Sequence, residues 1–559
     1  MSAEPAEVRR ILRLALPPAR RLWGAIALGA LSAGSAVALL ACSAWLITRA
    51  SEQPALMYIS LAVVGVRAFA LGRAFFRYLE RLAGHDAAFR QLAVIRSELF
   101  TRLVPLAPDG LGDTRRGDLL SGLADDVDEL QNHSLRVVQP LVTSGLVAAV
   151  SVVATFLVLP EAGVALLVSL VLAFGLGSLI NSRVSGRAER GIAPLRARLN
   201  DAILDLTTNL DVLTAFDALP RAQRRVAEAS ERLTSAVRSR AIGAGLTAAV
   251  VSVLAGGATT LALLAGIPAL TAGRLDAPSL AVLALLPLAV FEVFGMVPLA
   301  LGARRQVVAS ATRLAAAAPT RPPAGIPVDR ERLSELSLEG VPAVELRSVN
   351  ARWPGAGSEV LTGVDLRLSP GERVLLAGPT GSGKTALAHV LTRFIDYEGE
   401  FTIGGTEANE LAQDDVRRVI GLCEQQPYLF DSDVRQNLLF ARPSASDDDL
   451  LAVLARVGLS EWVGERGGLD ARVGERGSLV SGGQAQRIAL ARAVLAGFPV
   501  LVVDEPTANV DAEVADRVVR DILSTAAEDG RTVLLISHTP VADDLITRRV
   551  VLEDGRLAG

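Results

Sequence analysis

Six apolar stretches, each long enough to cross a lipid bilayer, occupy the chain before about residue 305. A helix needs about 20 mostly apolar residues to span the hydrocarbon core. The stretches lie at 22–48, from 54 into a polar cluster at 77–86, at 137–159, 162–182, 241–270 and 277–303. The pattern predicts a helical membrane domain with six spans.

Composition agrees with a membrane protein that carries a soluble part. The chain has 559 residues, of which 50% are hydrophobic and 21% are charged, and this length predicts several domains. The net charge of −4 supplies no overall basic field, so no nucleic-acid partner is expected. Cys42 and Cys423 are too far apart in sequence for a thiolate metal motif or a disulfide framework, and we expect two inert thiols.

The arginines predict how the chain is oriented in the membrane. Several precede the first span, Arg304 and Arg305 follow the sixth, and the long polar segments 81–136 and 183–240 fall on that same side. Basic residues favour the cytoplasmic face, so the amino terminus and everything after the sixth span are expected there. The domain boundaries that follow are an amphipathic amino-terminal helix at 1–21 without a cleavable signal peptide, a transmembrane domain at 22–315, a linker at 316–343 and a soluble domain at 344–559.

The soluble domain alternates short apolar strands with helical stretches, which predicts a doubly wound α/β fold. The sequence GPTGSGKT lies between a predicted strand and a predicted helix, as a phosphate-binding loop does. Its eight residues are candidate ATP ligands: Gly378, Pro379, Thr380, Gly381, Ser382, Gly383, Lys384 and Thr385. Lys384 is expected at the β- and γ-phosphates and Thr385 on Mg²⁺.

Two carboxylates follow a second apolar strand at 500–503. Asp504 is expected to bind Mg²⁺, and Glu505 is our candidate general base that polarises the attacking water. Farther along, SGGQAQRIALARA places Ser481, Gly482, Gly483 and Gln484 at the start of a helix, where bare amides suit an anion. This sequence resembles the signature motif of ABC transporters.

The resemblance assigns further roles. It implies that Trp353 stacks on adenine, that Gln425 touches Mg²⁺ and signals to the membrane domain, and that His538 contacts the γ-phosphate. Asp511 matches the D-loop, and VGERG at 473–477 matches a loop that contacts a coupling helix of the partner. In this family each ATP lies between the phosphate loop of one domain and the signature motif of another. The chain is therefore expected to dimerise, with coupling helices near 110–120 and 209–216.

Three stretches outside the ATP motifs are more specific. FRYLERLAGHDAAFRQLAVIRSELFTRLVPLAP, RRGDLLSGLADDVDELQNHSLRVVQPLV and FEVFGMVPLA resemble the CydC half of CydDC-type heterodimeric exporters. That resemblance implies a bacterial cytoplasmic membrane, a CydD-like partner chain, a role in cytochrome bd assembly, and glutathione, cysteine or haem as small-molecule cargo. It leaves the choice between thiol and haem open.

A polar cluster at the end of the second span is a candidate haem site. Its residues lie at helical spacing, with Arg81 one turn before His85 and Tyr78 on the same face. His85 is the candidate axial ligand, and Arg81 and Arg77 would supply charge to the propionates. The competing interpretation is an ion-pair cluster of Arg77, Glu80, Arg81 and Asp86 at a helix end.

Glu292 stands alone among apolar residues of the sixth span, where a carboxylate is costly unless it faces a cavity or a basic group. We expect Glu292 and at least one of Arg67 and Arg73 to line the transport pathway, and a buried structural pair is the alternative. His133 and His389 have no ligand set nearby in sequence and are interpreted as structural.

Other functions compete with a thiol or haem exporter. A lipid or drug exporter predicts a cavity with few charges, whereas Arg67, Arg73 and Glu292 are available here. A haem-sensing regulator would transport nothing, and only a flux assay separates it. A soluble ABC ATPase that handles nucleic acid is excluded by the six spans.

Overall fold

The computed structural model describes residues 5–111, 125–180, 183, 186–329, 333, 334, 336, 340–506, 512–538 and 541–558. It divides into two units. The membrane unit comprises Met1–Arg102 and Arg115–Pro319, and the nucleotide unit comprises Leu103–Thr114 and Thr320–Gly559. The short segment Leu103–Thr114, which follows the second span in sequence, therefore belongs with the nucleotide unit.

Six helices of the described residues are long and apolar enough to cross a membrane, which confirms the predicted number of spans. They are α2 (Ala19–Ser51), α3 (Leu56–Leu103), α6 (Gln139–Val158), α7 (Pro160–Ile180), α10 (Leu219–Thr271) and α11 (Ala277–Phe294), which continues as α12 (Met296–Ala317). Shorter elements complete this unit: α1 (Pro5–Leu14), α5 (Val127–Leu130), the π-helical turn η4 (His133–Val138), α8 (Gly186–Thr208) and α9 (Leu210–Ala215).

Small side chains let the membrane helices approach closely. Ala162 of α7, Ala258 and Ala262 of α10 and Ala173 of α7 are all buried where these helices pack. In a bilayer, van der Waals packing of small residues replaces the hydrophobic effect as the main cause of helix association. The sixth span departs from a single rod, because the helix is interrupted at Gly295 between α11 and α12.

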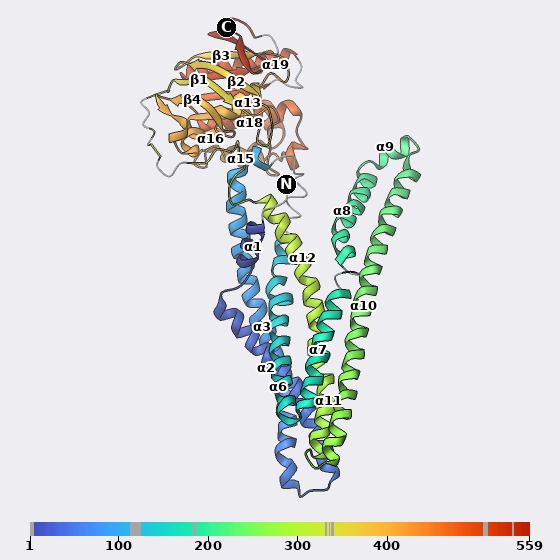
Figure 1. Cartoon of the computed structure of the whole chain (residues 1–559). Coiled ribbons are helices and arrows are strands. Elements are labelled where there is room, and N and C mark those ends of the chain that lie inside the picture. The colour runs from blue at the N-terminus through green and yellow to red at the C-terminus, as the bar shows by residue number, and fades with distance from the viewer. Residues whose placement is uncertain are drawn as a thin grey trace. The chain divides into compact units, whose positions relative to one another are not determined.

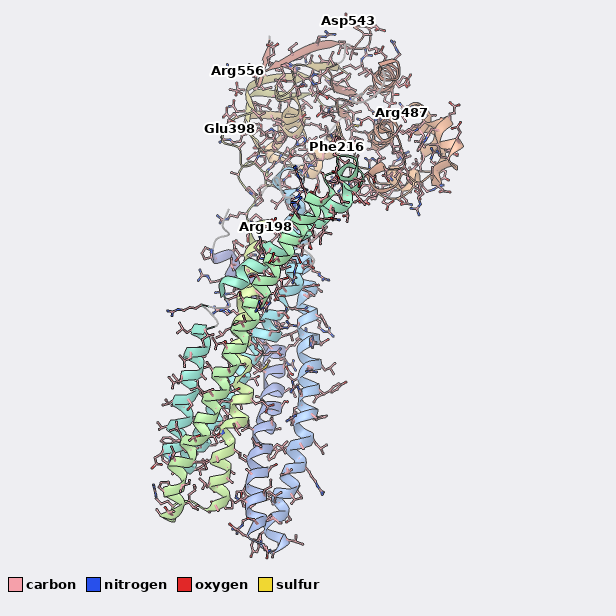
Figure 2. All side chains as sticks on the ribbon, turned by 90° about the vertical axis from the view of Figure 1, so that its right-hand side faces the viewer. Arg198, Phe216, Glu398, Arg487, Asp543 and Arg556 are labelled. Carbon is pink, nitrogen blue, oxygen red and sulfur yellow. The ribbon has the colours of Figure 1, made fainter. Side chains whose placement is uncertain are left out.

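The α8–α9–α10 hairpin extends from the apolar bundle (Figure 1). Its arms run side by side, and the short helix α9 turns the chain between them, in the stretch where a coupling helix is expected. Phe216 lies at the tip and is 80% exposed, while Arg198 lies along the α8 arm (Figure 2). The tip thus presents apolar side chains that no described part of this chain covers.

The nucleotide unit contains two sheets. The four-stranded sheet is antiparallel, in the order β2 (Leu361–Leu368), β1 (Val344–Ala351), β4 (Tyr397–Ile403) and β5 (Thr406–Glu407). The six-stranded sheet has the order β10 (Arg556–Ala558), β9 (Arg548–Glu553), β3 (Arg373–Ala377), β8 (Thr532–Ile536), β7 (Val500–Asp504) and β6 (Ile420–Cys423), and β9 to β6 run parallel. The parallel sheet confirms the predicted α/β fold, and the antiparallel sheet is an addition.

The helices of this unit are α13 (Lys384–Leu391), α14 (Gln413–Val419), α15 (Val434–Leu439), α16 (Asp447–Arg456), α17 (Ser460–Glu465), α18 (Gly482–Ala496) and α19 (Ala512–Glu528). Helices α13, α14, α18 and α19 pack on the parallel sheet, whereas α15 and α16 pack on α18, and α17 packs on α16. Strands β7 and β8 are buried along their whole length, as expected for parallel strands covered on both faces. Their carboxyl ends, together with that of β3, carry the site.

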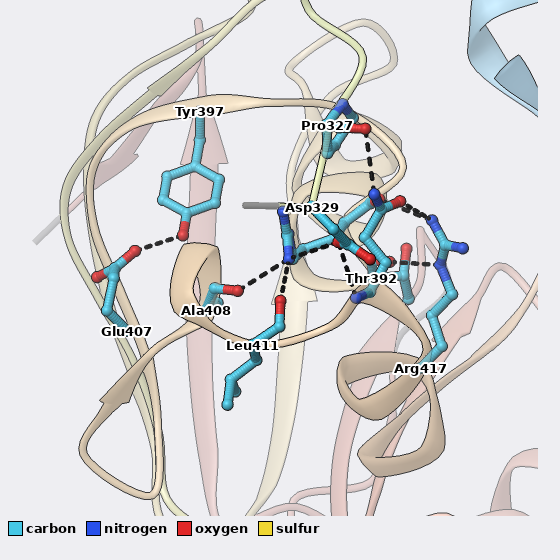
Figure 3. A network of polar contacts seen from close by, with 10 residues as sticks. Pro327, Asp329, Thr392, Tyr397, Glu407, Ala408, Leu411 and Arg417 are labelled. Carbon is cyan, nitrogen blue, oxygen red and sulfur yellow. Dashed lines mark hydrogen bonds and ion pairs between the residues drawn. The ribbon is translucent and has the colours of Figure 1, made fainter. Parts of the chain in front are cut away.

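The linker is held by a buried arginine, Arg393, whose partners Asp329, Ala408 and Leu411 are labelled in Figure 3. Arg393 is 1% exposed, donates hydrogen bonds to the carbonyl oxygens of Ala408 (3.0 Å) and Leu411 (2.7 Å), and lies 3.7 Å from the Asp329 carboxylate. Gln413 adds a bond from its Nε2 to the carbonyl oxygen of Pro327 at 3.1 Å. Residues 327–329 therefore lie against this unit.

Candidate functional site

The phosphate loop depends on glycines at three positions. Gly378, Gly381 and Gly383 have φ angles of 152°, 84° and 104°, in the region that L side chains rarely adopt. A Cβ atom at Gly378 would lie 2.2 Å from the Leu552 carbonyl oxygen, and one at Gly383 would lie 2.9 Å from that of Val360. The loop between β3 and α13 is therefore closed against neighbouring backbone and tolerates no side chain at these two positions.

The interior of this loop is prepared for an anion. Lys384 is buried, and its Nζ donates hydrogen bonds to the loop's own carbonyl oxygens, those of Gly378 (3.0 Å) and Pro379 (2.9 Å). The buried hydroxyl of Ser382 has no hydrogen-bond partner among the described residues. An ammonium group, an unpaired hydroxyl and the amino end of α13 fit a phosphate, so the eight residues predicted from GPTGSGKT form one cradle.

A hydroxyl and a carboxylate meet beside the cradle. Thr385 Oγ1 donates a hydrogen bond of 2.9 Å to Asp504 Oδ2, although the two residues are 119 positions apart. Asp504 ends β7 and is 5% exposed, and its burial raises the pKa of the carboxyl above the usual range. This oxygen pair fits Mg²⁺, which prefers oxygen ligands.

Glu505 is the centre of a three-residue cluster. Its Oε2 accepts a hydrogen bond of 2.6 Å from Gln425 Nε2, and its Oε1 lies 2.6 Å from His538 Nε2. The backbone N–H of Glu505 bonds to the carbonyl oxygen of Ile536 at 2.9 Å, which holds the residue at an unusual φ of 45°. The structure thus brings together three residues that the sequence placed in separate motifs.

The signature motif forms a capped helix. Ser481 Oγ accepts from the backbone N–H of Gln484 (3.3 Å), and Gln484 Oε1 accepts from the N–H of Ser481 (2.8 Å), a capping box at the start of α18. Gly482 and Gly483 complete this exposed helix start. Within the described chain, no hydrogen bond joins the motif to the phosphate loop. Trp353 follows β1 and is half-buried, and Asp511 lies outside the described residues.

A cavity of about 640 Å³ lies in the membrane unit, at the break between α11 and α12. Its lining combines apolar side chains with Glu292, Arg136, Arg240 and Gln306. Arg67 and Arg73 do not line it and are exposed on α3, so their predicted place on the pathway stays a prediction. The sequence did not lead us to predict Arg136 and Arg240 as lining residues. Each directly precedes an apolar span, and a basic residue at that position is the signal that could have identified them.

The proposed haem residues lie on an exposed face of α3. Arg77, Tyr78, Arg81 and His85 are all exposed, and the His85 ring is tilted on Phe89 at a centroid distance of 5.8 Å. Asp86 pairs with Arg90 at 3.0 Å. Among the described residues no ion pair within 4 Å joins Arg77 or Arg81 to Glu80 or Asp86, but the charges of Arg77 and Arg81 both act on Glu80. The haem site and the ion-pair cluster therefore both stay predictions.

Comparison with known proteins identifies the family. The model for the ABC transporter matches residues 361–508, and the model for the ABC transporter transmembrane region matches residues 23–292. The chain is 29% identical to the Escherichia coli glutathione/L-cysteine transport system protein CydC, over 94% of this chain and 91% of that one. It is 30% identical to the Bacillus subtilis protein CydD of the same transport system, over 95% and 92%. The chain belongs to the CydC/CydD family of ABC transporters.

A solved structure of a bacterial Atm1-family ABC exporter with ATP bound has the same fold as this CydC/CydD family member. The TM-score is 0.79 over 97% of this chain and 94% of that one, at 23% identity. The fold prediction of an exporter-type membrane domain fused to an ABC nucleotide-binding domain is therefore confirmed. The chain is an ABC-type ATPase coupled to membrane transport, and it is one half of an exporter.

A second hollow, on the nucleotide unit of this CydC/CydD family member, was not predicted. It measures about 560 Å³ and is lined by exposed aromatic side chains, Tyr428, Phe430 and Phe440, together with Arg492. Phe430 packs on Phe440 with ring centroids 4.2 Å apart. Cys423 also lines this hollow. Burial raises the pKa of the Cys423 thiol to about 12, so the thiol is unreactive.

Proposed function

We propose that this chain is the CydC-like half of a heterodimeric exporter that moves glutathione and cysteine across the bacterial cytoplasmic membrane in support of cytochrome bd assembly. The relatives are named as glutathione/L-cysteine transport proteins, and these two compounds give the chemical class of the proposed cargo. The observation that carries the proposal is the cavity around Glu292, because charges of both signs lie in one apolar pocket. The amino terminus and the nucleotide unit are proposed to lie in the cytoplasm.

The cavity suits a small zwitterion better than a lipid. Glutathione and cysteine carry an ammonium group for Glu292 and carboxylates for Arg136 and Arg240. The volume of about 640 Å³ is within the range of ligand pockets, about 300 to 1,000 Å³. Glu292, Arg136 and Arg240 are exposed in this subunit, so their charges can reach a cargo. A lipid or drug exporter favours a lining with few charges, because an apolar cargo displaces water from a charge and offers it no hydrogen bond in return.

ATP binding and hydrolysis at the nucleotide site drive the proposed transport. The cradle and Lys384 bind the phosphates. Thr385 and Asp504 would hold Mg²⁺, with Gln425 as an additional ligand, and the ion would offset charge on the phosphates. Glu505 accepts a proton from the attacking water, and His538 lies beside it for the γ-phosphate. Because the signature motif serves a second chain, closure around ATP joins two subunits and reorients the membrane cavity.

Two exposed apolar surfaces of this chain are suited to contact with a CydD-like partner. The α9 tip exposes Leu210, Val212 and Phe216, and the hollow on the nucleotide unit exposes aromatic rings. A partner with the same fold carries an equivalent tip and an equivalent hollow. Each tip is proposed to dock into the hollow of the other subunit, which buries apolar surface on both.

The test is ATP-dependent uptake of glutathione and cysteine by inverted vesicles that contain the two-chain complex. Glu292→Gln is expected to weaken apparent affinity about ten-fold or more, since a hydrogen bond to a charged group contributes about 1.5–3 kcal/mol. Glu161→Gln is the matched control, because this exposed carboxylate lies outside the cavity lining and pairs with Arg274 at 3.7 Å. Equal uptake by Glu292→Gln and the parent would reject the cavity as the cargo site.

A second candidate ligand is haem, favoured by the exposed imidazole of His85. The imidazole of His85, the guanidinium of Arg81 one turn away and the apolar ring of Phe89 would hold a haem on the exposed face of α3. Haem, when bound, would supply the iron, and the His85 imidazole would be its protein ligand. Arg81 and Arg77 would pair with its propionates.

Haem titration of the complex, followed by the Soret band, tests this second candidate. His85→Ala is expected to lose the band shift of the parent, and His133→Ala, with a half-buried ring on η4, is expected to keep it. An unchanged Soret band and affinity in His85→Ala would remove this residue as a ligand.

A further inference from the structure

His389 connects the helix after the phosphate loop with Asp109, a distant residue of the chain, and the sequence did not predict this contact. It belongs to α13, the helix that begins with Lys384 of the phosphate loop, and it is 9% exposed. Its Nδ1 lies 2.6 Å from Asp109 Oδ2, across 280 positions of sequence. Because a carboxylate only accepts, Nδ1 carries the proton of this hydrogen bond.

Two aromatic rings hold the imidazole of His389. Trp353 packs against it in a T-shaped arrangement, with ring centroids 5.3 Å apart and an interplanar angle of 73°, and Phe394 does the same at 5.6 Å and 73°. Trp353 is the residue proposed to stack on adenine. The imidazole of His389 therefore contacts the adenine platform and Asp109 at the same time.

The Asp109 side of the junction is packed closely. Asp109 begins the short helix η2 (Asp109–Leu111), and a Cβ atom at Gly110 would lie 3.0 Å from Ile326 Cγ1 of the linker. Ile326 is itself buried, and the next residue, Pro327, is bound by Gln413. Among the described residues, those at 103–111 thus pack within the nucleotide unit through a close approach at Gly110 and a charged contact at Asp109, and His389 makes the charged one.

We infer that His389 is a positioning residue that passes nucleotide binding at Trp353 on to the segment Leu103–Thr114 through its contact with Asp109. Adenine stacked on Trp353 fixes the indole ring. A fixed indole restricts the imidazole that packs against it, and the restricted imidazole holds Asp109. The inference rests on ATP binding, which the family establishes, and on Trp353 as the adenine platform, but not on the identity of the cargo.

The test is amide hydrogen exchange in the two-chain complex, with Glu505→Gln in every sample to preserve bound ATP. In the parent, saturating Mg·ATP is expected to slow exchange between Leu103 and Leu111. In His389→Ala that protection is expected to fall about five-fold or more, and the affinity for a fluorescent ATP analogue to fall by a similar factor, since coupling between two sites is reciprocal. His389→Asn keeps a nitrogen donor near the place of Nδ1 and is expected to restore part of both.

Arg352→Ala is the matched control, because this exposed side chain adjoins Trp353 in sequence but pairs with Glu398 at 3.2 Å. It is expected to behave as the parent. Asp109→Asn and Trp353→Ala test the two ends of the connection, and each is expected to reduce the protection. Unchanged protection in His389→Ala at saturating ATP overturns the inference, and so does weaker ATP binding with intact protection.

Discussion

Glu505 is positioned by its neighbours as much as by its strand. Strand β7 delivers it to the edge of the sheet, but its positive φ is unfavourable for a non-glycine residue and persists because the backbone bond to Ile536 and the side-chain contacts hold it. Gln425 and His538 take up its two carboxylate oxygens. The backbone and both carboxylate oxygens of Glu505 are therefore held by neighbouring residues.

Replacing Glu505 should separate ATP binding from hydrolysis. Glu505→Gln keeps the size of the side chain but removes the proton acceptor, so turnover at this site is expected to fall about 10²- to 10⁴-fold while ATP binding persists. Single-turnover phosphate release, in a complex whose other site is disabled, measures the effect. Glu553→Gln, at an exposed strand end, is the control. Near-normal turnover would reject Glu505 as the base.

The buried carboxyl of Asp504 predicts a pH dependence. Burial raises its pKa, and this is only partly offset by the hydrogen bond from Thr385. Because the folded pKa exceeds the unfolded value, its contribution to stability is complete below the unfolded pKa and is lost as the pH rises through the folded pKa. Mg²⁺ requires the ionised form, so affinity for Mg·ATP is expected to fall on acidification at a higher pH than an ordinary aspartate allows.

Thermal melting and Mg·ATP titrations across pH measure this effect. Asp504→Asn is expected to bind Mg·ATP weakly and to remove the part of the pH dependence that Asp504 causes in both experiments. The same pH profile in the parent and in Asp504→Asn would show that another group is responsible.

Single residues were predictable where a motif is continuous in sequence. The loop 378–385 follows from one eight-residue motif, because local backbone geometry and local chemistry coincide there. Arg136, Arg240 and Glu292 line one cavity because three separate helices pack together. The sequence around each residue gives no sign of the other two. His389 was interpreted as structural for the same reason, since its partner Asp109 is distant in the chain.

At the scale of elements, one buried carboxylate joins the start of α5 to α12. Asp126 accepts hydrogen bonds from Ser310 Oγ at 2.9 Å and Arg313 Nε at 2.8 Å, and Arg313 Nη2 also bonds to it. Asp126→Asn is expected to destabilise the membrane unit by about 1–3 kcal/mol, because donors that bonded a charge are left with a weaker acceptor. A lower melting temperature of the purified complex measures the loss.

Asp128→Asn is the control for that prediction. Asp128 lies two residues away and pairs with Arg96 at 2.6 Å, but both side chains are about half exposed. Exposed ion pairs contribute about 0–1 kcal/mol, so its melting temperature should hardly change. Equal effects of the two substitutions would contradict the assignment of Asp126 as the stronger connection.

The number of membrane-spanning helices was predictable from the sequence, but several details of the helices and sheets were not. Hydropathy located all six spans, because a bilayer imposes a length that a sequence shows directly. The break at Gly295, the π-helical turn η4 and the antiparallel sheet were not predicted, since each depends on contacts with other elements. The assignment of Leu103–Thr114 to the nucleotide unit was equally invisible, because its sequence continues a membrane helix.

At the scale of the whole molecule, the exposed α9 tip predicts dependence on a partner. Phe216→Ser is expected to lower cargo-stimulated ATPase activity of the two-chain complex several-fold and to weaken its association, because the apolar contact with the partner is lost. Arg198→Ser, on the same hairpin but away from the tip, is the control (Figure 2). Stimulation equal to that of the parent would exclude the tip as a contact between subunits.

The engagement of both Glu505 oxygens has one more consequence for the assembled transporter. Gln425 and His538 each contact one carboxylate oxygen, and because each oxygen has a second lone pair, the group can still accept a proton from a water molecule while both neighbours hold it. An acceptor held from two sides keeps its orientation, so closure of the two subunits around ATP meets a proton acceptor that already points in a fixed direction.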